Sequence, residues 1–95
     1  MDASEKQQER LIKQRDRIKE QISSNLDLLI GSVGKSAAMR NYNLTTKIGG
    51  KTATLYVRKG LVATVRKMTA RHAKLKHLIG ELSRVNWELL KIESR

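Results

Sequence analysis

The sequence predicts a mainly α fold with a β-hairpin (α+β), in which two long helices flank a two-stranded antiparallel ribbon. Two observations predict it: apolar residues recur at helical spacing towards both ends of the chain, and residues 42–58 alternate with a period of two. Ninety-five residues suit one small domain. We therefore expect a single domain over 1–95, made of a helix 3–31, a loop 32–41, a hairpin 42–58 and a helix 60–93.

The first predicted helix, residues 3–31, carries a narrow apolar stripe on a charged surface. The stripe consists of Leu11, Ile18, Ile22, Leu26, Leu29 and Ile30. Gly31 follows the last of them and is expected to end the helix in a left-handed cap conformation. Residues 35–41, "KSAAMRN", follow no clear pattern, so they are expected to form a loop or a short turn.

The predicted hairpin has its register set by Gly49 and Gly50, which suit the two central positions of a type I′ turn. This turn pairs Ile48 with Lys51, Thr46 with Ala53, Leu44 with Leu55 and Tyr42 with Val57, on one mostly apolar face. The other face carries Asn43, Thr45, Lys47, Thr52, Thr54, Tyr56 and Arg58. Because a lone ribbon is marginal in water, the apolar face is expected to lie on a helix or another subunit.

The second predicted helix, residues 60–93, carries an unbroken heptad seam. The seam consists of Leu61, Val65, Met68, His72, Leu75, Ile79, Leu82, Asn86 and Leu89, and it is the expected oligomer interface. A flanking row of Leu78, Val85 and Ile92 widens the apolar surface. One part of this surface is therefore expected to hold the first helix and the rest a second copy, as a coiled-coil or four-helix dimer. Trp87 is expected to pack against the first helix.

The net charge of +11 is concentrated in the middle of the chain. Acids and bases balance over residues 1–31 and again over 78–95, and no acid occurs between Asp27 and Glu81. The excess consists of Lys35, Arg40, Lys47, Lys51, Arg58, Lys59, Arg66, Lys67, Arg71, Lys74 and Lys76. Since an ordinary solvated surface mixes both signs, this segment predicts a polyanionic partner.

The expected binding surface combines the polar hairpin face with the basic start of the second helix. Its residues are Lys35, Arg40, Thr45, Lys47, Lys51, Thr52, Thr54, Tyr56, Arg58, Lys59, Arg66, Lys67, Arg71 and Lys74. The two parts are expected to join through residues 56–60 into one strip. The second helix begins at "VRKGL" without a Ser, Thr or Asp cap, and its free N–H groups beside two cations suit a phosphate. A hairpin that runs directly into a helix, with Gly60 as a permissive N-cap, explains the same residues equally well.

The residues that enzymes use are poorly represented. His72 and His77 are five apart and lie on different helix faces, and no Cys or nearby acid completes a metal site, so no metal or other cofactor is expected. His72 fits a core or interface position, and Asn86 fits a role in fixing helix register. We therefore expect no enzyme. The polar N-terminus and the absence of a long apolar run favour a cytoplasmic protein without a membrane span.

The arrangement also resembles an uncharacterised family of small bacterial and archaeal proteins with a helix, "GS", hairpin and helix in that order. The matching stretches are "LLIGSV" at 28–33, "GGKTATLYVRKGL" at 49–61 and "LKHLIGELSRVNWELLK" at 75–91. Many members of that family carry a Cys/His segment before the hairpin, which this chain lacks. Members often occur near mobile elements, so the resemblance implies a DNA-handling accessory role.

The predicted function is non-enzymatic binding of nucleic acid by a homodimer. DNA is favoured over RNA as the ligand, and double-stranded DNA is the form expected. The few exposed aromatic residues argue against single-strand binding by stacking. Two alternatives stay open. The first is a protein-binding adaptor or inhibitor of phage or mobile-element type that presents the same basic strip to another protein. The second is a structural coiled-coil scaffold whose charge is incidental.

Overall fold

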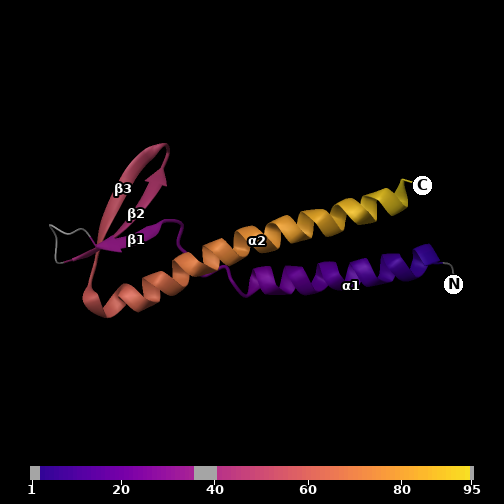
Figure 1. The fold of residues 1–95 in the computed structure, drawn as a ribbon, viewed down its shortest axis with the longest axis horizontal. Helices are drawn as coiled ribbons and strands as arrows, with labels where there is room; N and C mark the ends of the chain where they lie inside the picture. Colours follow the sequence, from indigo (N-terminus) through magenta and orange to yellow (C-terminus); the bar gives the residue numbers. More distant parts are fainter. Residues whose placement is uncertain (1–2, 36–40, 95) are drawn as a thin grey trace. The chain divides into compact units, whose positions relative to one another are not determined.

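The computed structural model describes residues 3–35 and 41–94 and contains two long helices and a three-stranded antiparallel sheet (Figure 1). The elements are α1 (Ala3–Ser23), β1 (Ser32–Lys35), β2 (Tyr42–Ile48), β3 (Lys51–Val57), the short 3₁₀ helix η1 (Lys59–Leu61) and α2 (Val62–Glu93). Internal contacts divide the chain into two compact units. The helical unit comprises Met1–Leu26 and Lys74–Arg95, and the sheet unit comprises Asp27–Ala73. The predicted α+β class is confirmed, with one strand more than expected.

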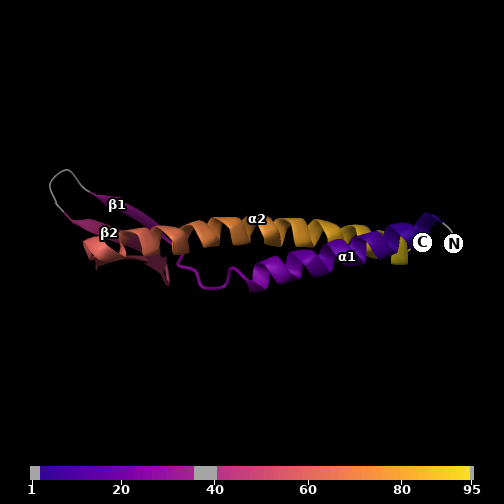
Figure 2. The same cartoon turned by 90° about the horizontal axis from the view of Figure 1, so that it is seen from below.

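In the helical unit, α1 lies antiparallel beside the C-terminal part of α2, and the start of α1 lies near the end of α2 (Figures 1 and 2). The two helices share a core because both present apolar residues at helical spacing. Its members are Ile18, Leu78, Val85 and Leu89, with Leu11, Ile12, Ile22 and Leu82 packed against them. The row predicted to flank the heptad seam therefore supplies two of the three buried α2 residues, Leu78 and Val85.

The first helix is shorter than predicted and ends at Ser23 instead of residue 31. Polar side chains at its end bond to carbonyl groups of the last turn: the Ser24 hydroxyl donates to the Glu20 carbonyl, and the Asn25 amide donates to the Gln21 carbonyl at 2.6 Å. Such bonds offer the backbone an alternative to further helix. Leu29, predicted to be helical, instead packs in the core of the sheet unit, and its N–H donates to the Met68 carbonyl at 3.1 Å.

The hairpin register is confirmed at every predicted pair. Tyr42 lies opposite Val57 and Ile48 opposite Lys51, with Leu44–Leu55 and Thr46–Ala53 between them. Gly49 and Gly50 have φ values of 58° and 81°, as the predicted two-glycine turn requires. The apolar and polar faces therefore fall as predicted, because directly opposed residues share a face.

Residues 32–35 were predicted to be a loop, but Ser32–Lys35 forms β1 and pairs antiparallel with β2. Ser32 lies opposite Thr45, and Lys35 lies opposite Tyr42. Four residues that include a glycine are too few to reveal an alternating pattern, so this pairing depends on the edge that β2 offers and not on local preference. The rest of the predicted loop, 36–40, lies outside the described residues.

The apolar sheet face is covered only at the end away from the turn. Leu44 and Val57 are buried there against Val62 at the start of α2. Beyond this part of the face, Ile48 next to the turn is 68% exposed, and Leu55, opposite Leu44 on β3, is 65% exposed. The chain passes from β3 through η1 directly into α2, so the helix reaches only the near end of the sheet. The apolar face was expected to lie on a helix or on another subunit, and its near end lies on α2.

Gly31 is not a helix cap but a point of close backbone approach. A Cβ atom at this position would lie 2.6 Å from the Thr45 carbonyl oxygen and 3.0 Å from a Leu44 methyl carbon. Its φ of 154° adds a conformation that L side chains rarely adopt. Gly31 therefore allows the chain to reach the edge of β2 just before β1 begins.

We predict that Gly31→Ala lowers the free energy of unfolding by about 1–3 kcal/mol, because the backbone at Thr45 has to shift to admit a methyl group. Gly34→Ala, three residues later in β1, is the matched control, since a Cβ there meets nothing within 4 Å. Urea denaturation of both variants measures the difference. Equal stabilities would show that the close approach at Gly31 has no energetic consequence.

Candidate nucleic-acid interface

The polar face of the sheet presents rows of short side chains that cross all three strands. Ser32, Thr45 and Thr54 form one row, because Thr45 pairs with both of the others. Asn43 and Tyr56 lie opposite each other in the next row. Thr54 and Tyr56 are exposed, whereas Thr45 and Asn43 are half-buried. The sheet therefore has the polar face that the hairpin pattern predicted, and β1 extends this face by one strand.

The turn end of the sheet carries two cations. Lys47 and Lys51 are both exposed. Lys51 directly follows the Gly49–Gly50 turn, and Lys47 lies two residues before it. Lys47 lies on the polar face opposite Thr52, whereas Lys51 pairs with Ile48 on the apolar face. The turn therefore directs one positive charge towards each side of the sheet.

The other end of the sheet brings together residues from three elements around Tyr42. The Lys35 Nζ atom, from β1, lies 5.6 Å from the centre of the Tyr42 ring. The guanidinium carbon of Arg66, from α2, lies 5.5 Å from the same centre. Both distances allow a cation–π interaction, which attracts a positive charge to the ring face. Lys35 and Arg66, distant in the sequence, are thus held near one aromatic ring.

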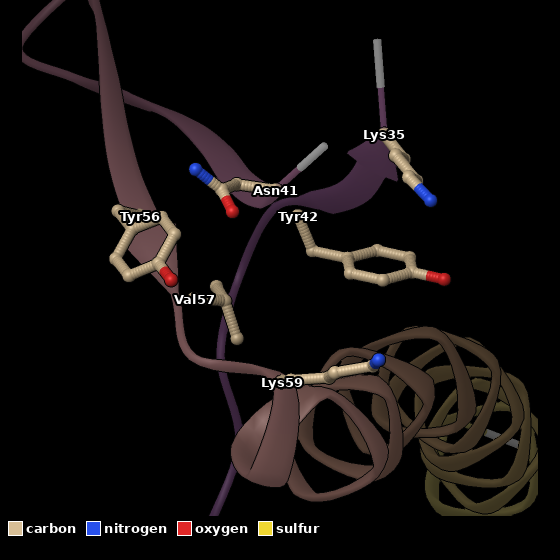
Figure 3. A pocket seen from close by; sticks show the side chains of 6 residues that line it. All are labelled: Lys35, Asn41, Tyr42, Tyr56, Val57 and Lys59. Atoms are coloured by element: carbon tan, nitrogen blue, oxygen red, sulfur yellow. The ribbon is translucent and has the colours of Figure 1, made fainter. Parts of the chain in front are cut away.

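A pocket opens beside this cluster and has a volume of about 140 Å³. It is lined by Lys35, Asn41, Tyr42, Tyr56, Val57 and Lys59. In the view of Figure 3, the amino ends of Lys35 and Lys59 lie on either side of the Tyr42 ring, and the Tyr42 hydroxyl extends between them. The lining is therefore rich in hydrogen-bond donors, with Val57 its one aliphatic side chain.

The start of the second helix comes directly after η1, whose first residue, Lys59, lines this pocket. Arg58 has extended backbone angles (φ −61°, ψ 144°) and makes no side-chain hydrogen bond that caps η1. Both Arg58 and Lys59 are exposed. The predicted absence of a cap is thus confirmed, and the α-helix proper begins at Val62 instead of residue 60.

The basic residues further along α2 do not continue the polar sheet face. Val62 and Val65 contact the apolar sheet face, and Lys67 is exposed five residues after Val62, which turns it to the far side of the helix. The polar sheet face points away from α2 in the opposite direction. The single strip predicted to join these surfaces is therefore wrong, because the helix covers the reverse side of the sheet.

Arg71 is already engaged within the sheet unit. Its guanidinium donates to the Asp27 carbonyl oxygen at 2.9 Å and lies 3.7 Å from the Asp27 carboxylate. Lys74 is exposed and belongs to the helical unit, and Arg40 lies outside the described residues. Arg71 is thus a weaker candidate for contacting a partner than the other cations of the sheet unit.

The charge balance of the sheet unit is strongly one-sided. Asp27 is the only Asp or Glu in the sequence of residues 27–73, and its carboxylate lies beside Arg71. No carboxylate of the same unit is therefore left for Lys35, Lys59 or Arg66. A positive field of this kind attracts polyanions.

The residues of the predicted oligomer seam are divided between the two units. Leu82 and Leu89 pack in the helical unit, and Val65 packs in the sheet unit. Met68, His72 and Leu75 are half-buried, while Leu61, Ile79 and Asn86 are exposed. Three of the nine residues thus belong to internal cores, and the exposed members form only part of the seam.

Trp87 does not pack against α1, contrary to expectation, and its side chain is 62% exposed. It lies two residues from both Val85 and Leu89, which face α1, so it points to a different side of α2. Ile79 and Leu90 are also exposed, at 52% and 56%. An apolar stripe on α2 is therefore left uncovered within the helical unit.

Sequence reasoning missed Ser32, Asn41 and Tyr42 as site residues. Ser32 was hidden by the unrecognised strand, and Tyr42 was assigned only to the apolar face. No local signal identifies the Tyr42 cluster, because Lys35 and Arg66 meet it through long-range contacts. Within residues 3–35 and 41–94, no three His, Asp or Glu side chains gather closely enough to hold a metal ion. Neither helix of that part of the chain is long and apolar enough to cross a membrane.

A scan against protein-family models, a search of curated proteins and a search of solved structures each found no match. The resemblance to a family with a helix, hairpin and helix order therefore stays a prediction.

Proposed function

We propose that the protein is a non-enzymatic nucleic-acid-binding protein that uses the sheet unit to bind double-stranded DNA. The observation that carries the proposal is the position of exposed cations around both ends of a sheet that has one polar face. Of these cations, only Lys47 lies on the polar face itself. Lys47 and Lys51 lie at the turn end, and Lys35, Lys59 and Arg66 lie at the other. Threonine, serine and asparagine side chains lie between them.

The dimensions of the sheet suit a duplex groove. Seven residues of β2 span about 20 Å at roughly 3.3 Å per residue, whereas the major groove of B-DNA is about 12 Å wide, so the strands can lie along the groove and not across it. In that orientation short hydroxyl and amide side chains face base edges, and cations at the ends of the sheet reach phosphates along the groove. The deep, narrow major groove of duplex RNA does not admit a sheet in this way, which favours DNA.

We further propose that the protein acts as a homodimer formed through the uncovered stripe of α2. Ile79, Asn86 and Leu90 recur at helical spacing on one side of the helix, with Trp87 beside them, and all four are exposed. This side differs from the one that contacts α1, so a second copy can pack there without displacing α1. The dimer would present two sheet units to one duplex.

A protein-binding adaptor is the second candidate, and one observation favours it. Ile48 and Leu55 form an exposed apolar strip on the sheet face opposite the threonines, and DNA binding gives this strip no role. Pull-down from a lysate treated with nuclease separates the two functions, because retained protein partners favour the adaptor. A coiled-coil scaffold without a ligand is the third possibility, and it predicts no binding in either experiment.

The DNA-binding proposal predicts a steep salt dependence. If about six phosphates are neutralised, the logarithm of the affinity should fall with the logarithm of salt concentration with a slope near −5. The double variant Lys47→Glu/Lys59→Glu should weaken binding at least about tenfold and make the slope shallower. Fluorescence anisotropy with duplex DNA, duplex RNA and single strands measures both quantities.

The matched control is Lys13→Glu/Lys19→Glu, which makes the same change in net charge on exposed positions of α1. It should alter the affinity by less than about twofold at moderate salt, because distant exposed charges are screened. Equal losses for the two double variants would mean that net charge alone drives binding. No binding of the wild type near physiological salt would refute the proposal.

The dimer proposal predicts that Ile79→Asp and Leu90→Asp each reduce the mass in solution from that of two chains to that of one, while the chain stays folded. Both positions are exposed within the chain, so a charge there is costly only in an assembly. Arg84→Asp is the control, since Arg84 is exposed and lies away from the stripe. Light scattering measures the mass and circular dichroism the helix content. If the wild type and both stripe variants have the mass of one chain, the dimer is excluded.

A further inference from the structure

The pocket beside Tyr42 is too small for an ordinary organic ligand. Pockets for drug-sized molecules measure about 300–1,000 Å³, whereas this one measures about 140 Å³. Its lining is also unsuited to an apolar occupant, because Lys35, Lys59, Asn41 and two tyrosines surround a single valine. Size and lining together favour one small polar group.

The charges around the pocket favour an anion. Lys35 and Arg66 each lie within 6 Å of the centre of one aromatic ring, and Lys59 lines the same pocket as Lys35. Three positive charges gathered in this way repel one another, and cation–π attraction to one ring offsets this only in part. The only carboxylate of the sheet unit belongs to Asp27, which is paired with Arg71. No carboxylate of the unit is therefore left to balance these three charges, which favours an anion from outside the unit.

The donors of the pocket match a phosphate group. In Figure 3 the amino groups of Lys35 and Lys59 and the Tyr42 hydroxyl, from β1, η1 and β2, lie towards one side of the pocket, whereas the Asn41 amide nitrogen is turned away from them. The two amino groups and the hydroxyl can each donate to a tetrahedral acceptor. Base stacking on Tyr42 is disfavoured, because Lys35 and Arg66 already lie against its ring.

We propose that this pocket binds a single phosphate group, with Lys35 and Lys59 as its main charged ligands and Arg66 as a supporting charge. The inference rests on the proposed function only for the source of the phosphate, which is the nucleic acid. Pocket binding fixes one phosphate in place at the open end of the sheet. The exposed lysines at the turn, by contrast, contact the backbone without a cavity around them.

The first test uses no nucleic acid, so its failure is distinct from failure of the proposed function. Amide signals are followed by two-dimensional NMR while sodium phosphate is added, and again with sodium chloride at the same ionic strength. We expect saturable shifts at Lys35, Asn41, Tyr42 and Lys59 with phosphate alone. Lys35→Ala and Lys59→Ala should each weaken phosphate binding by about tenfold. Lys51→Ala, at the exposed turn, should leave it unchanged. Shifts that do not saturate, or equal shifts at Lys47 and Lys51, would overturn the pocket.

The second test identifies the source of the phosphate. Binding of wild type and Lys35→Ala is compared on blunt duplexes with 5′-phosphate or 5′-hydroxyl ends. An equal loss on both duplexes assigns the pocket to an internal phosphodiester, and a loss only on the phosphorylated duplex assigns it to a terminal phosphate. If Lys35→Ala binds both duplexes as tightly as the wild type does, the pocket does not take its phosphate from nucleic acid.

Discussion

The sheet unit depends on one local constraint, the two-glycine turn at Gly49 and Gly50. Both residues have positive φ, which side chains with a Cβ atom rarely adopt. Because this turn admits only two central residues, it determines which residue of β3 lies opposite each residue of β2. A slip by one position would move every side chain of a strand to the other face. Leu44 would then leave the core against Val62, and the threonines would be buried instead of exposed.

The second constraint is the close approach of the chain to β2 at Gly31. It allows β1 to pair along the edge of β2, and this pairing brings Lys35 opposite Tyr42. The hairpin alone contributes Tyr42, and η1 and α2 contribute Lys59 and Arg66. The cluster of cations is therefore complete only when β1 is paired with β2.

The hairpin was predictable because its turn and its alternation are both local and agree with each other. The end of α1 and the existence of β1 were not, because side-chain bonds to helix carbonyls and an available sheet edge decided them. The same limit applies to the site. The sequence identified Lys35, Lys59 and Arg66 as basic residues of interest, but only long-range packing shows that two of them lie against Tyr42. It also assigned Lys67 to the wrong side, since the side of α2 that faces the sheet depends on the exit of the chain from β3.

The concentration of positive charge has a consequence for stability as well as for binding. Like charges held near one another destabilise the compact state, and the sheet unit has a single carboxylate to offset them. A ligand that binds only the folded form stabilises it by mass action. An anion at the Tyr42 cluster would therefore remove repulsion and hold β1, β2 and the start of α2 together at once, because Lys35, Tyr42 and Arg66 belong to those three elements. On this argument, the unpaired cations are a cost to the free protein that binding of a polyanion reverses.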